Sequence, residues 1–310
     1  MRAFLYDVNN KEWALPLLYE WEVCHGTGES CDYFEFSCAY DKSMPDKLAS
    51  AVRFKGVNNG DTVFYGVVDE YRITCDDSGS AVTVSGRGMA ALLMDNEAEA
   101  ATYASLGLDT VLERHVRPYG FSKIEQKSMP RLRLFTVASG ESEWSVLTKF
   151  CRYSCNIQPR VSKDGVLILN DKTGRSLKFT EGGNLFYIRR RDCRYGAISS
   201  VTVKNPVTGA RYTVHNDELE ARGGRSRRVL SVPRKTGADA MRYRGEYQIR
   251  QSGKGKNTLE LGIMAQFAGF PGDVAEVDLP SVGIRGRYKV IQSRCWADAD
   301  DAGTYLTLEV

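Results

Sequence analysis

Apolar and polar residues alternate in short runs over the first 85 or so residues, and each run ends at turn-forming residues. An alternating pattern is typical of a strand with one buried face, and the runs are rich in Val, Tyr and Phe, which favour strands. Turn sequences such as Asn58-Asn59-Gly60 and Asp76-Asp77-Ser78-Gly79 separate them, as in hairpins. The spacing predicts a small antiparallel barrel or sandwich. The predicted strands are 2–8, 19–26, 33–40, 51–57, 62–75 and 81–86.

The hydrophobic period changes after Gly88. In "MAALLMDNEAEA" (89–100) the apolar residues recur every three or four positions, with Met89, Leu92 and Leu93 on one face, which predicts a helix. The "SGRG" sequence before it (85–88) lacks the Lys-Ser or Lys-Thr of a phosphate-binding loop. We interpret it as a structural glycine corner.

Two more helices and a hairpin follow. Residues 108–120 have Asp109 as the expected N-cap and Gly120 as the expected C′ residue. A second amphipathic segment covers 141–155, and two strands around Asp164-Gly165 come directly after it. Residues 94–185 are therefore expected to form a compact α+β module. The stripe of the second helix consists of Trp144, Leu147, Phe150 and Cys151.

Strand patterns return from Asn184 to the C-terminus, interrupted by the polar segment 223–237 and a helix at 238–252 whose Met241 and Tyr247 are expected to dock. The fold class is thus mainly β with an α+β insert, consisting of two small antiparallel barrels and a helix-containing module. The expected domains are 1–93, 94–185 and 186–310, the last with a helical excursion at about 237–252. The predicted late strands are 184–195, 198–206, 210–216, 258–267, 273–280, 286–298 and 303–310.

Composition narrows the function classes only slightly. The 310 residues are 42% hydrophobic, enough for a sizeable core in two or three domains. The chain has 42 Lys and Arg and 39 Asp and Glu, so its net charge is +3. This charge is too small to indicate that the whole surface attracts nucleic acid or an anionic membrane. The eight Cys lack a disulfide framework and are interpreted as reduced thiols made in a cytosol. Without a signal-peptide core or a long apolar run, we expect a soluble chain without membrane anchoring.

Sequence signals for catalysis are scarce. The three histidines, His25, His115 and His215, lie in no metalloprotease motif, and there is no G-x-S-x-G elbow. We therefore predict no catalytic residues, no cofactor site and no enzymatic activity.

Two clusters were weighed as metal sites. Cys151 and Cys155 face the same way on a predicted helix, and Cys24 with His25 could complete a zinc set, but buried packing of the thiols is favoured. The carboxylates in "WADADDAG" (296–303) resemble part of a calcium loop without its bidentate Glu, which favours a solvated hairpin tip. No metal site is predicted.

Two local runs of arginine, "YIRRRDCR" and "RGGRSRR", are the candidate contact sites. Arg is preferred where planar contacts to phosphate or carboxylate are needed, so these runs could line a channel for DNA or grip an acidic neighbour. A solvated flexible loop is the favoured interpretation, especially for the second run. Of the two contacts, protein is favoured over nucleic acid. The candidate residues are Arg189, Arg190, Arg191, Arg194, Arg222, Arg225, Arg227 and Arg228.

The order of the modules resembles the baseplate hub proteins of contractile phage tails, the group that includes the phage late control protein D family and the hubs of tail-like injection particles. The resemblance is carried by three stretches: 62–98, with its strands, "G-R" and Leu-Met-Asp; 141–171, with an aromatic-bearing helix and a "D-G-x-L" hairpin; and 270–310, with a "G-x-Y-x-V" strand and an alternating last strand. It spans nearly the whole chain.

The resemblance implies a homotrimeric, pseudo-sixfold ring that joins the tail tube to the central spike. The implied partners are the tail tube protein, the spike protein, other baseplate subunits and the tape measure protein, with transient passage of DNA. The implied location is the virion baseplate, assembled in the bacterial host cytoplasm. The sequence ends at "LTLEV" without the cell-wall extension of fuller members, so we expect cell-wall cutting to come from other chains.

Two alternatives remain. One is a distal tail protein or secretion-system hub of another tail type. The other is a cell-wall-binding or cell-wall-cutting tail protein that uses Trp13, Trp21, Trp144 and Trp296 as sugar platforms, although no pair of carboxylates stands out for glycoside chemistry.

Overall fold

The computed structural model describes residues 1–27, 32–77, 79–232 and 238–310. The chain divides into two compact units. Unit 1 comprises Met1–Tyr187 and Leu261–Thr307, and unit 2 comprises Ile188–Glu260 and Leu308–Val310. Each unit is considered by itself below.

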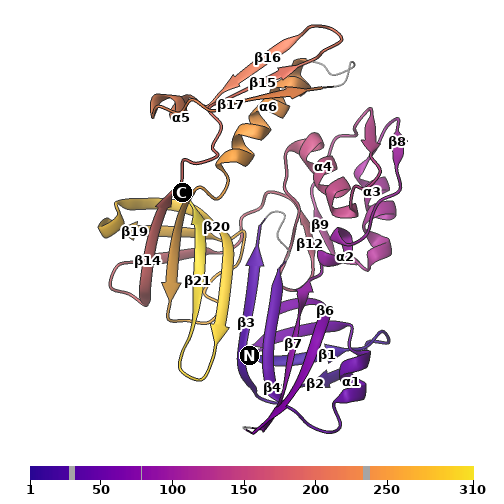
Figure 1. The fold of residues 1–310 in the computed structure, drawn as a ribbon, viewed down its shortest axis with the longest axis vertical. Helices are drawn as coiled ribbons and strands as arrows, with labels where there is room; N and C mark the ends of the chain where they lie inside the picture. The colour runs from indigo at the N-terminus through magenta and orange to yellow at the C-terminus, as the bar shows by residue number, and fades with distance from the viewer. Residues whose placement is uncertain (28–31, 78, 233–237) are drawn as a thin grey trace. The chain divides into compact units, whose positions relative to one another are not determined.

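The N-terminal strands of unit 1 form one antiparallel sheet in which hairpin neighbours pair (Figure 1). The six strands predicted from alternation are all present. Strand β2 and helix α1, which begins at a proline, were missed because each is too short to show a period. The order is β3-β4-β7-β6-β5-β1-β2. The bounds are β1 Arg2–Tyr6, β2 Glu12–Ala14, β3 Leu18–Gly26, β4 Tyr33–Ala39, α1 Pro45–Ser50, β5 Arg53–Asn58, β6 Asp61–Asp76 and β7 Gly79–Gly88.

A cluster of phenylalanines fills the inner side of this sheet. Phe34 stacks on Phe54 with ring centroids 4.0 Å apart, and Phe64 meets Phe34 edge-on at 5.2 Å. All three side chains are fully buried, as the alternating pattern predicted. Burial of such large apolar surfaces is the main stabilising contribution to this part of the fold.

The "SGRG" sequence is not the predicted corner but the end of strand β7, paired with β4 and β6, and its glycines have a structural role. A Cβ on Gly86 would lie 2.0 Å from the Val67 carbonyl oxygen, and a Cβ on Gly66 would lie 2.1 Å from that of Arg87. Strands β6 and β7 therefore approach each other more closely than side chains allow. A register shift between Val68 and Glu70 marks a bulge at the same place.

The helix predicted over 89–100 is wrong in its length. Helix α2 covers only Ala91–Met94, and Glu97 already bridges to Ser142 in an extended conformation. The Asn96 side chain donates to the Leu92 carbonyl at 2.7 Å, so it takes the place of a continuing helical bond. The apolar face of 89–93 is nevertheless buried, which explains why its spacing looked helical.

The rest of the helix-containing module agrees with the sequence pattern, with different caps. Helix α3 begins after Gly107 rather than at the expected cap Asp109, and Gly120 is left-handed at the end of a following 3-10 turn. On α4 the Ser142 hydroxyl accepts from the Ser145 amide, and the predicted stripe is buried. The bounds are β8 Ala101–Tyr103, α3 Leu108–His115, η1 Arg117–Tyr119, β9 Ile124–Gln126, β10 Phe135–Val137, α4 Glu143–Cys155, β11 Arg160–Val161 and β12 Leu167–Leu169.

The C-terminal strands of unit 1 continue the N-terminal sheet, because β20 pairs antiparallel with β3 from Gln292 to Ala297. The earlier half of β20 pairs with β19, and β19 pairs in parallel with β13. Trp21 on β3 stacks on Phe267 at 5.3 Å, so the N-terminal core includes residues from the end of the chain. The bounds are β13 Ser176–Thr180, β19 Val274–Leu279, η2 Pro280–Val282 and β20 Ile284–Ala297.

Three strands of the same sheet carry the chain between the units: β14 Leu185–Asp192, β18 Asn257–Ile263 and β21 Ala302–Glu309. Unit 2 has a separate three-stranded sheet in the order β16-β15-β17, with a helix whose Met241 is buried as predicted. Strand β17 corrects the expectation that its segment is only polar, and position 237 of the predicted helical excursion lies outside the described residues. The bounds are β15 Ser200–Lys204, β16 Arg211–His215, α5 Asp217–Ala221, β17 Arg227–Ser231 and α6 Ala238–Gly253.

The predicted class, mainly β with a helix-containing module, is confirmed. None of the helices within the described ranges is long and apolar enough to cross a bilayer.

Candidate partner-contact surface

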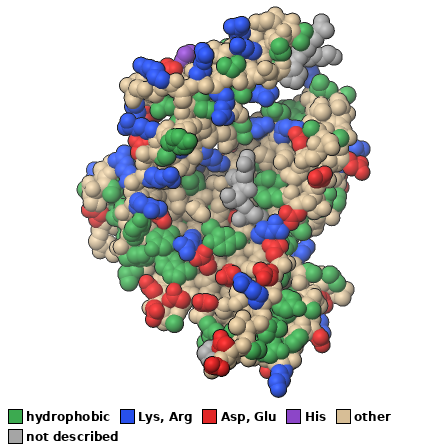
Figure 2. Space-filling view, in the orientation of Figure 1, with side chains coloured by type: hydrophobic (Ala, Val, Ile, Leu, Met, Phe, Trp, Pro, Cys, Tyr) green, Lys and Arg blue, Asp and Glu red, His purple; other side chains and the backbone are tan. Residues whose placement is uncertain are grey.

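Positive charge is concentrated in unit 2. Residues 188–260 contain 17 Lys and Arg against 7 Asp and Glu, a net charge of +10, whereas the whole chain has +3. The remaining residues are therefore net negative. Lys and Arg side chains gather over β15, β16 and α6 in the upper part of the view (Figure 2). The near-neutral total hides a strongly basic local surface.

The three-stranded sheet of unit 2 has one covered and one open face. Val201 and Val203 are fully buried and belong to the core that includes Met241 of α6. Helix α6 packs closely because it carries Gly245, where a Cβ would lie 2.6 Å from the Val214 side chain. Alternation then places Ser200, Thr202 and Lys204 of β15 on the opposite face.

The first arginine run lies on β14 and just after it. Arg189, Arg190 and Arg191 are all exposed, and Arg189 pairs with Glu260 on β18. Three consecutive exposed residues mean that this end of the strand has no buried face in the chain itself. Its guanidinium groups can therefore reach a partner from more than one side.

One carboxylate joins the two arginine runs. Asp192 pairs with Arg194 at 3.9 Å and also with Arg222, 30 residues further along the chain. Arg222 is held from its other side by Glu218 on α5, at 3.7 Å. The structure thus brings both predicted runs to one surface of unit 2.

The second run is not the flexible loop considered from its sequence. Arg227 and Arg228 belong to β17, and Arg225 donates to the Gly224 carbonyl at 3.0 Å. Because Arg227 is opposite Ser200 and Arg228 is opposite Val201, Arg227 extends over the open face and Arg228 over the α6 side.

Sequence reasoning missed further polar residues on the open face. Lys204 is paired in register with Arg211, and Ser200 lies between His215 on β16 and Arg227 on β17. Thr202 and Thr213 hydrogen-bond across the middle of this face at 3.1 Å. Apart from Arg227, these residues are not part of a run of basic residues in the sequence. Each of the others lies at a polar position of the alternating pattern of a predicted strand.

The chemistry of this surface suits an anionic partner. Arg forms planar, two-point hydrogen bonds to carboxylate and phosphate, and these gain strength from its charge. The acidic residues of the unit occupy Arg189, Arg194 and Arg222, while cations outnumber them by ten. The surface therefore carries an excess of positive charge that the acidic residues of its own unit do not balance.

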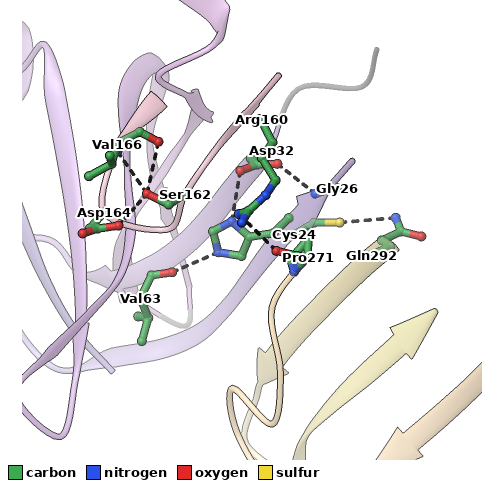
Figure 3. A network of polar contacts seen from close by, with 11 residues as sticks. Cys24, Gly26, Asp32, Val63, Arg160, Ser162, Asp164, Val166, Pro271 and Gln292 are labelled. Atoms are coloured by element: carbon green, nitrogen blue, oxygen red, sulfur yellow. Dashed lines mark hydrogen bonds and ion pairs between the residues drawn. The ribbon is translucent and has the colours of Figure 1, made fainter. Parts of the chain in front are cut away.

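A second polar network lies inside unit 1 and joins distant parts of its sequence (Figure 3). The His25 ring contacts the Asp32 carboxylate at 3.0 Å and the Val63 carbonyl at 2.9 Å. Asp32 also accepts from the Gly26 amide, and it lines a cavity of about 20 Å³ with Arg160. That volume holds about one water molecule, so the network has no room for a substrate.

Arg160 extends this network toward the C-terminal segment, because its guanidinium donates to the Pro271 carbonyl at 3.4 Å. Burial lowers the pKa of Arg160, and the carboxylates of Asp273 and Glu125 act in the opposite direction. We interpret the network as a structural joint between strands, hairpin and C-terminal loop.

The other two histidines also have partners within the chain. His115 is buried, and it contacts Glu143 at 2.6 Å and the Tyr103 hydroxyl at 3.1 Å, while Tyr119 donates to the other Glu143 oxygen. This network joins α3 to the start of α4. His215 contacts Glu220 on the surface of unit 2 at 2.9 Å.

The two clusters considered as metal sites are a buried thiol on a helix and a hairpin turn. Burial raises the pKa of the Cys151 thiol to about 12, and the Asp298 carboxylate accepts the amides of Asp300 and Asp301 at a hairpin tip. Across the described ranges, no three His, Cys, Asp or Glu side chains gather as a metal site would require. Seven of the cysteines are free thiols, and Cys31 lies outside the described residues.

Two of the four tryptophans considered as sugar platforms are inaccessible, while Trp13 and Trp296 are half-buried. Trp21 and Trp144 are buried, and Trp21 stacks inside the core. Trp296 is half-buried and stacks on Tyr305 at 4.9 Å.

The fold is that of phage tail proteins. A tail protein from Neisseria meningitidis MC58 is 17% identical, with a TM-score of 0.79 over 99% of this chain and 95% of that one. The 43 kDa tail protein of prophage MuSo2 from Shewanella oneidensis is 16% identical, with a TM-score of 0.80 over 99% and 98%. An Escherichia coli type VI secretion component, described as similar to two bacteriophage T4 tail proteins, is 11% identical, with a TM-score of 0.58 over 94% and 73%. No protein-family model and no curated protein matches the sequence.

Proposed function

We propose that this chain is a structural hub of a phage or phage-like tail baseplate. Three copies would form a pseudo-sixfold ring that joins the tail tube to the central spike and lets DNA or the tape measure protein pass. The tail tube protein, the spike protein and other baseplate subunits are its proposed partners. The proposed place of assembly is the bacterial host cytoplasm, and the proposed final location is the virion baseplate.

The observation that carries this proposal is the fold likeness over the whole chain. Two tail proteins match with TM-scores of 0.79 and 0.80, and each is covered nearly end to end. A match that covers nearly all of both chains supports a shared architectural role more than a match to a single domain does. The pairing of β20 with β3 also supports the proposal, since one sheet then runs through both β-rich parts of unit 1.

The division into domains 1–93, 94–185 and 186–310 belongs to this proposal. The first and last would supply the two tube-like parts that three copies turn into six positions around a bore. The helix-containing module would contact neighbouring baseplate subunits. The eight candidate arginines of unit 2 would face the bore or an acidic partner.

We further propose that the chain acts without catalysis. His25 and His115 are buried and bound by side chains of the chain itself, which supports a structural role for both. Incubation with purified bacterial cell walls tests this directly. Clearing of the suspension by this chain alone would overturn the proposal.

Mass measurement of the purified chain, alone and mixed with its spike protein, tests the hub role. We expect a trimer at high concentration or with the spike. A hexamer would instead indicate the ring of a distal tail protein. Particles produced without this chain should lack the junction between tube and spike in negative-stain images.

A secretion-system hub is the second candidate, supported by the likeness to the Escherichia coli type VI component. Genetic replacement distinguishes the two. Loss of tail particles supports the phage role, and loss of secretion with normal particles supports the alternative.

A further inference from the structure

Strand β6 has a half that is paired on one side only. Its first half is held between β5 and β7, with the β5 pairing running from Asp61 to Val67. Its second half, Glu70–Asp76, pairs only with β7 among the strands that the structure describes. An open strand edge presents unpaired backbone groups and is a template for another strand.

The side chains of this half lie at the margin of the core. Residues 69–77 are all exposed, including Tyr71 at 40% and Ile73 at 39%. Their partners across the hairpin, Val84 and Val82, are fully buried. An added strand would therefore satisfy the backbone edge and also cover apolar surface that continues the phenylalanine core.

A second open edge exists in the same unit. Strand β13 pairs only with β19 among the strands that the structure describes. Its residues alternate, with Phe179 buried and Ser176, Lys178 and Thr180 exposed. Strand β13 therefore resembles the second half of β6: both strands have apolar residues on one face and polar residues on the other.

The two edges carry opposite charge. Segment 69–77 has four carboxylates and one arginine, a formal charge of −3, and segment 172–180 has three cations and no carboxylate. Four of the charged residues have ion-pair partners within the chain and so contribute less to an outside contact: Asp69 with Arg87, Glu70 with Arg72, Arg72 also with Glu35, and Arg175 with Asp273. The charged residues are Asp69, Glu70, Arg72, Asp76 and Asp77 on the first, and Lys172, Arg175 and Lys178 on the second.

We propose that the β6 edge of one copy pairs with the β13 edge of a second copy. The occupant is a second copy because both edges, complementary in charge and pattern, belong to this one chain. Joining two different edges makes a head-to-tail contact, which closes into a ring when the rotation allows. The inference rests on the proposed ring and assigns its contact strands.

Disulfide trapping tests the contact. Cys75 is an exposed free thiol on the β6 edge, so a second cysteine on β13 can be bonded to it across the interface. Residues opposed on neighbouring strands have Cα atoms about 4.5–5.5 Å apart, within the range a disulfide spans. Cys75 lies on the same strand face as Tyr71 and Ile73, so the variants Leu177→Cys and Phe179→Cys, on the apolar side of β13, are the ones that can oppose it. At least one should give covalent dimers and trimers under mild oxidation, and none should do so once Cys75→Ser is added.

Reversal of charge and polarity tests the same contact without a crosslink. Ile73→Lys should raise the concentration at which half of the copies assemble about tenfold, and Lys178→Glu about fivefold. Lys178→Glu combined with Asp77→Lys should restore assembly to within about twofold of the wild type. The controls are Val8→Lys and Lys42→Glu, at exposed positions away from both edges. Circular dichroism and thermal melting confirm that each variant is folded.

The outcomes separate this inference from the proposed function. Trimers that persist unchanged in Ile73→Lys and Lys178→Glu, with no crosslink to Cys75, would overturn the inference and leave the ring intact. A wild-type chain that stays monomeric at high concentration and with its spike would overturn both.

Discussion

Unit 1 and unit 2 differ in the size of their hydrophobic cores and in the balance of their charges. Unit 1 buries a phenylalanine cluster, and many of its charges are matched inside the chain, as where Arg87 binds Asp69 and Asp95 together at 2.7 to 3.0 Å. Unit 2 has a core of small aliphatic residues around Met241 and an excess of ten positive charges in 188–260.

The difference suggests that one unit provides stability and the other provides contacts with a partner. A unit with a large aromatic core and matched charges is stable on its own. A unit with a small core and a net positive charge has unfavourable repulsion between its own charges, and the binding of an anionic partner would relieve it. We expect unit 1 to determine the stability of the chain and unit 2 to determine what it holds.

The largest expected effect contrasts the two cores. Phe54→Ala should lower the free energy of unfolding of unit 1 by about 3–5 kcal/mol, because it removes a fully buried ring from a stacked cluster. Met241→Ala should lower that of unit 2 by about 2 kcal/mol. Hydrogen exchange, read separately for peptides of each unit, measures both.

Leu17→Ala, at a position 84% exposed, is the control and should change neither unit. If either core variant lowers the free energy of unfolding of both units by the same amount, the units unfold together. Their stabilities could then not be assigned to separate cores.

The next effect concerns the charges. Replacing Arg189, Arg190 and Arg191 with Ser should leave the fold intact and reduce the yield of infectious particles about tenfold, equivalent to about 1.4 kcal/mol of lost contact. The matched control removes three exposed cations of unit 1 through Lys11→Ser, Lys42→Ser and Arg285→Ser. A normal yield from the unit 2 variant would show that the three arginines are solvated and make no contact needed for assembly. An equal loss from both variants would show that the yield depends on the net charge of the chain and not on this surface.

The smallest effect depends on pH. Burial favours the neutral form of Glu22, but hydrogen bonds from Arg294 and Tyr33 outweigh it and hold the pKa of Glu22 below its usual 4.5. The unfolded state then binds the proton more readily than the folded state does. The contribution of this pair to stability is therefore full above about pH 4.5 and is lost as the pH falls through the folded pKa.

Glu22→Gln should cost about 1 kcal/mol at pH 7 and progressively less as the pH is lowered below about 4.5, by urea unfolding at each pH. A penalty that stays constant over this range would show that packing, and not charge, is what Glu22 contributes.

Local patterns determined much of the fold before any contact was known. The alternation of residues 33–39 placed Phe34 and Phe36 inside, and the period of 143–155 placed Trp144 and Phe150 inside. Both follow from geometry, since one residue in two on a strand, or one in three to four on a helix, faces the core.

Contacts between distant residues were decided only by the tertiary structure. Helix α2 ends early because Asn96 takes its last carbonyl and residue 97 finds a strand partner 45 residues away. Asp192 joins two arginine runs that the sequence keeps apart, and Arg160 reaches Pro271 across more than a hundred residues. A local period records which side of an element is buried, but it carries no information on what lies against that side. The partners are selected by the packing free energy of the whole chain, and so the folded coordinates were needed to identify them.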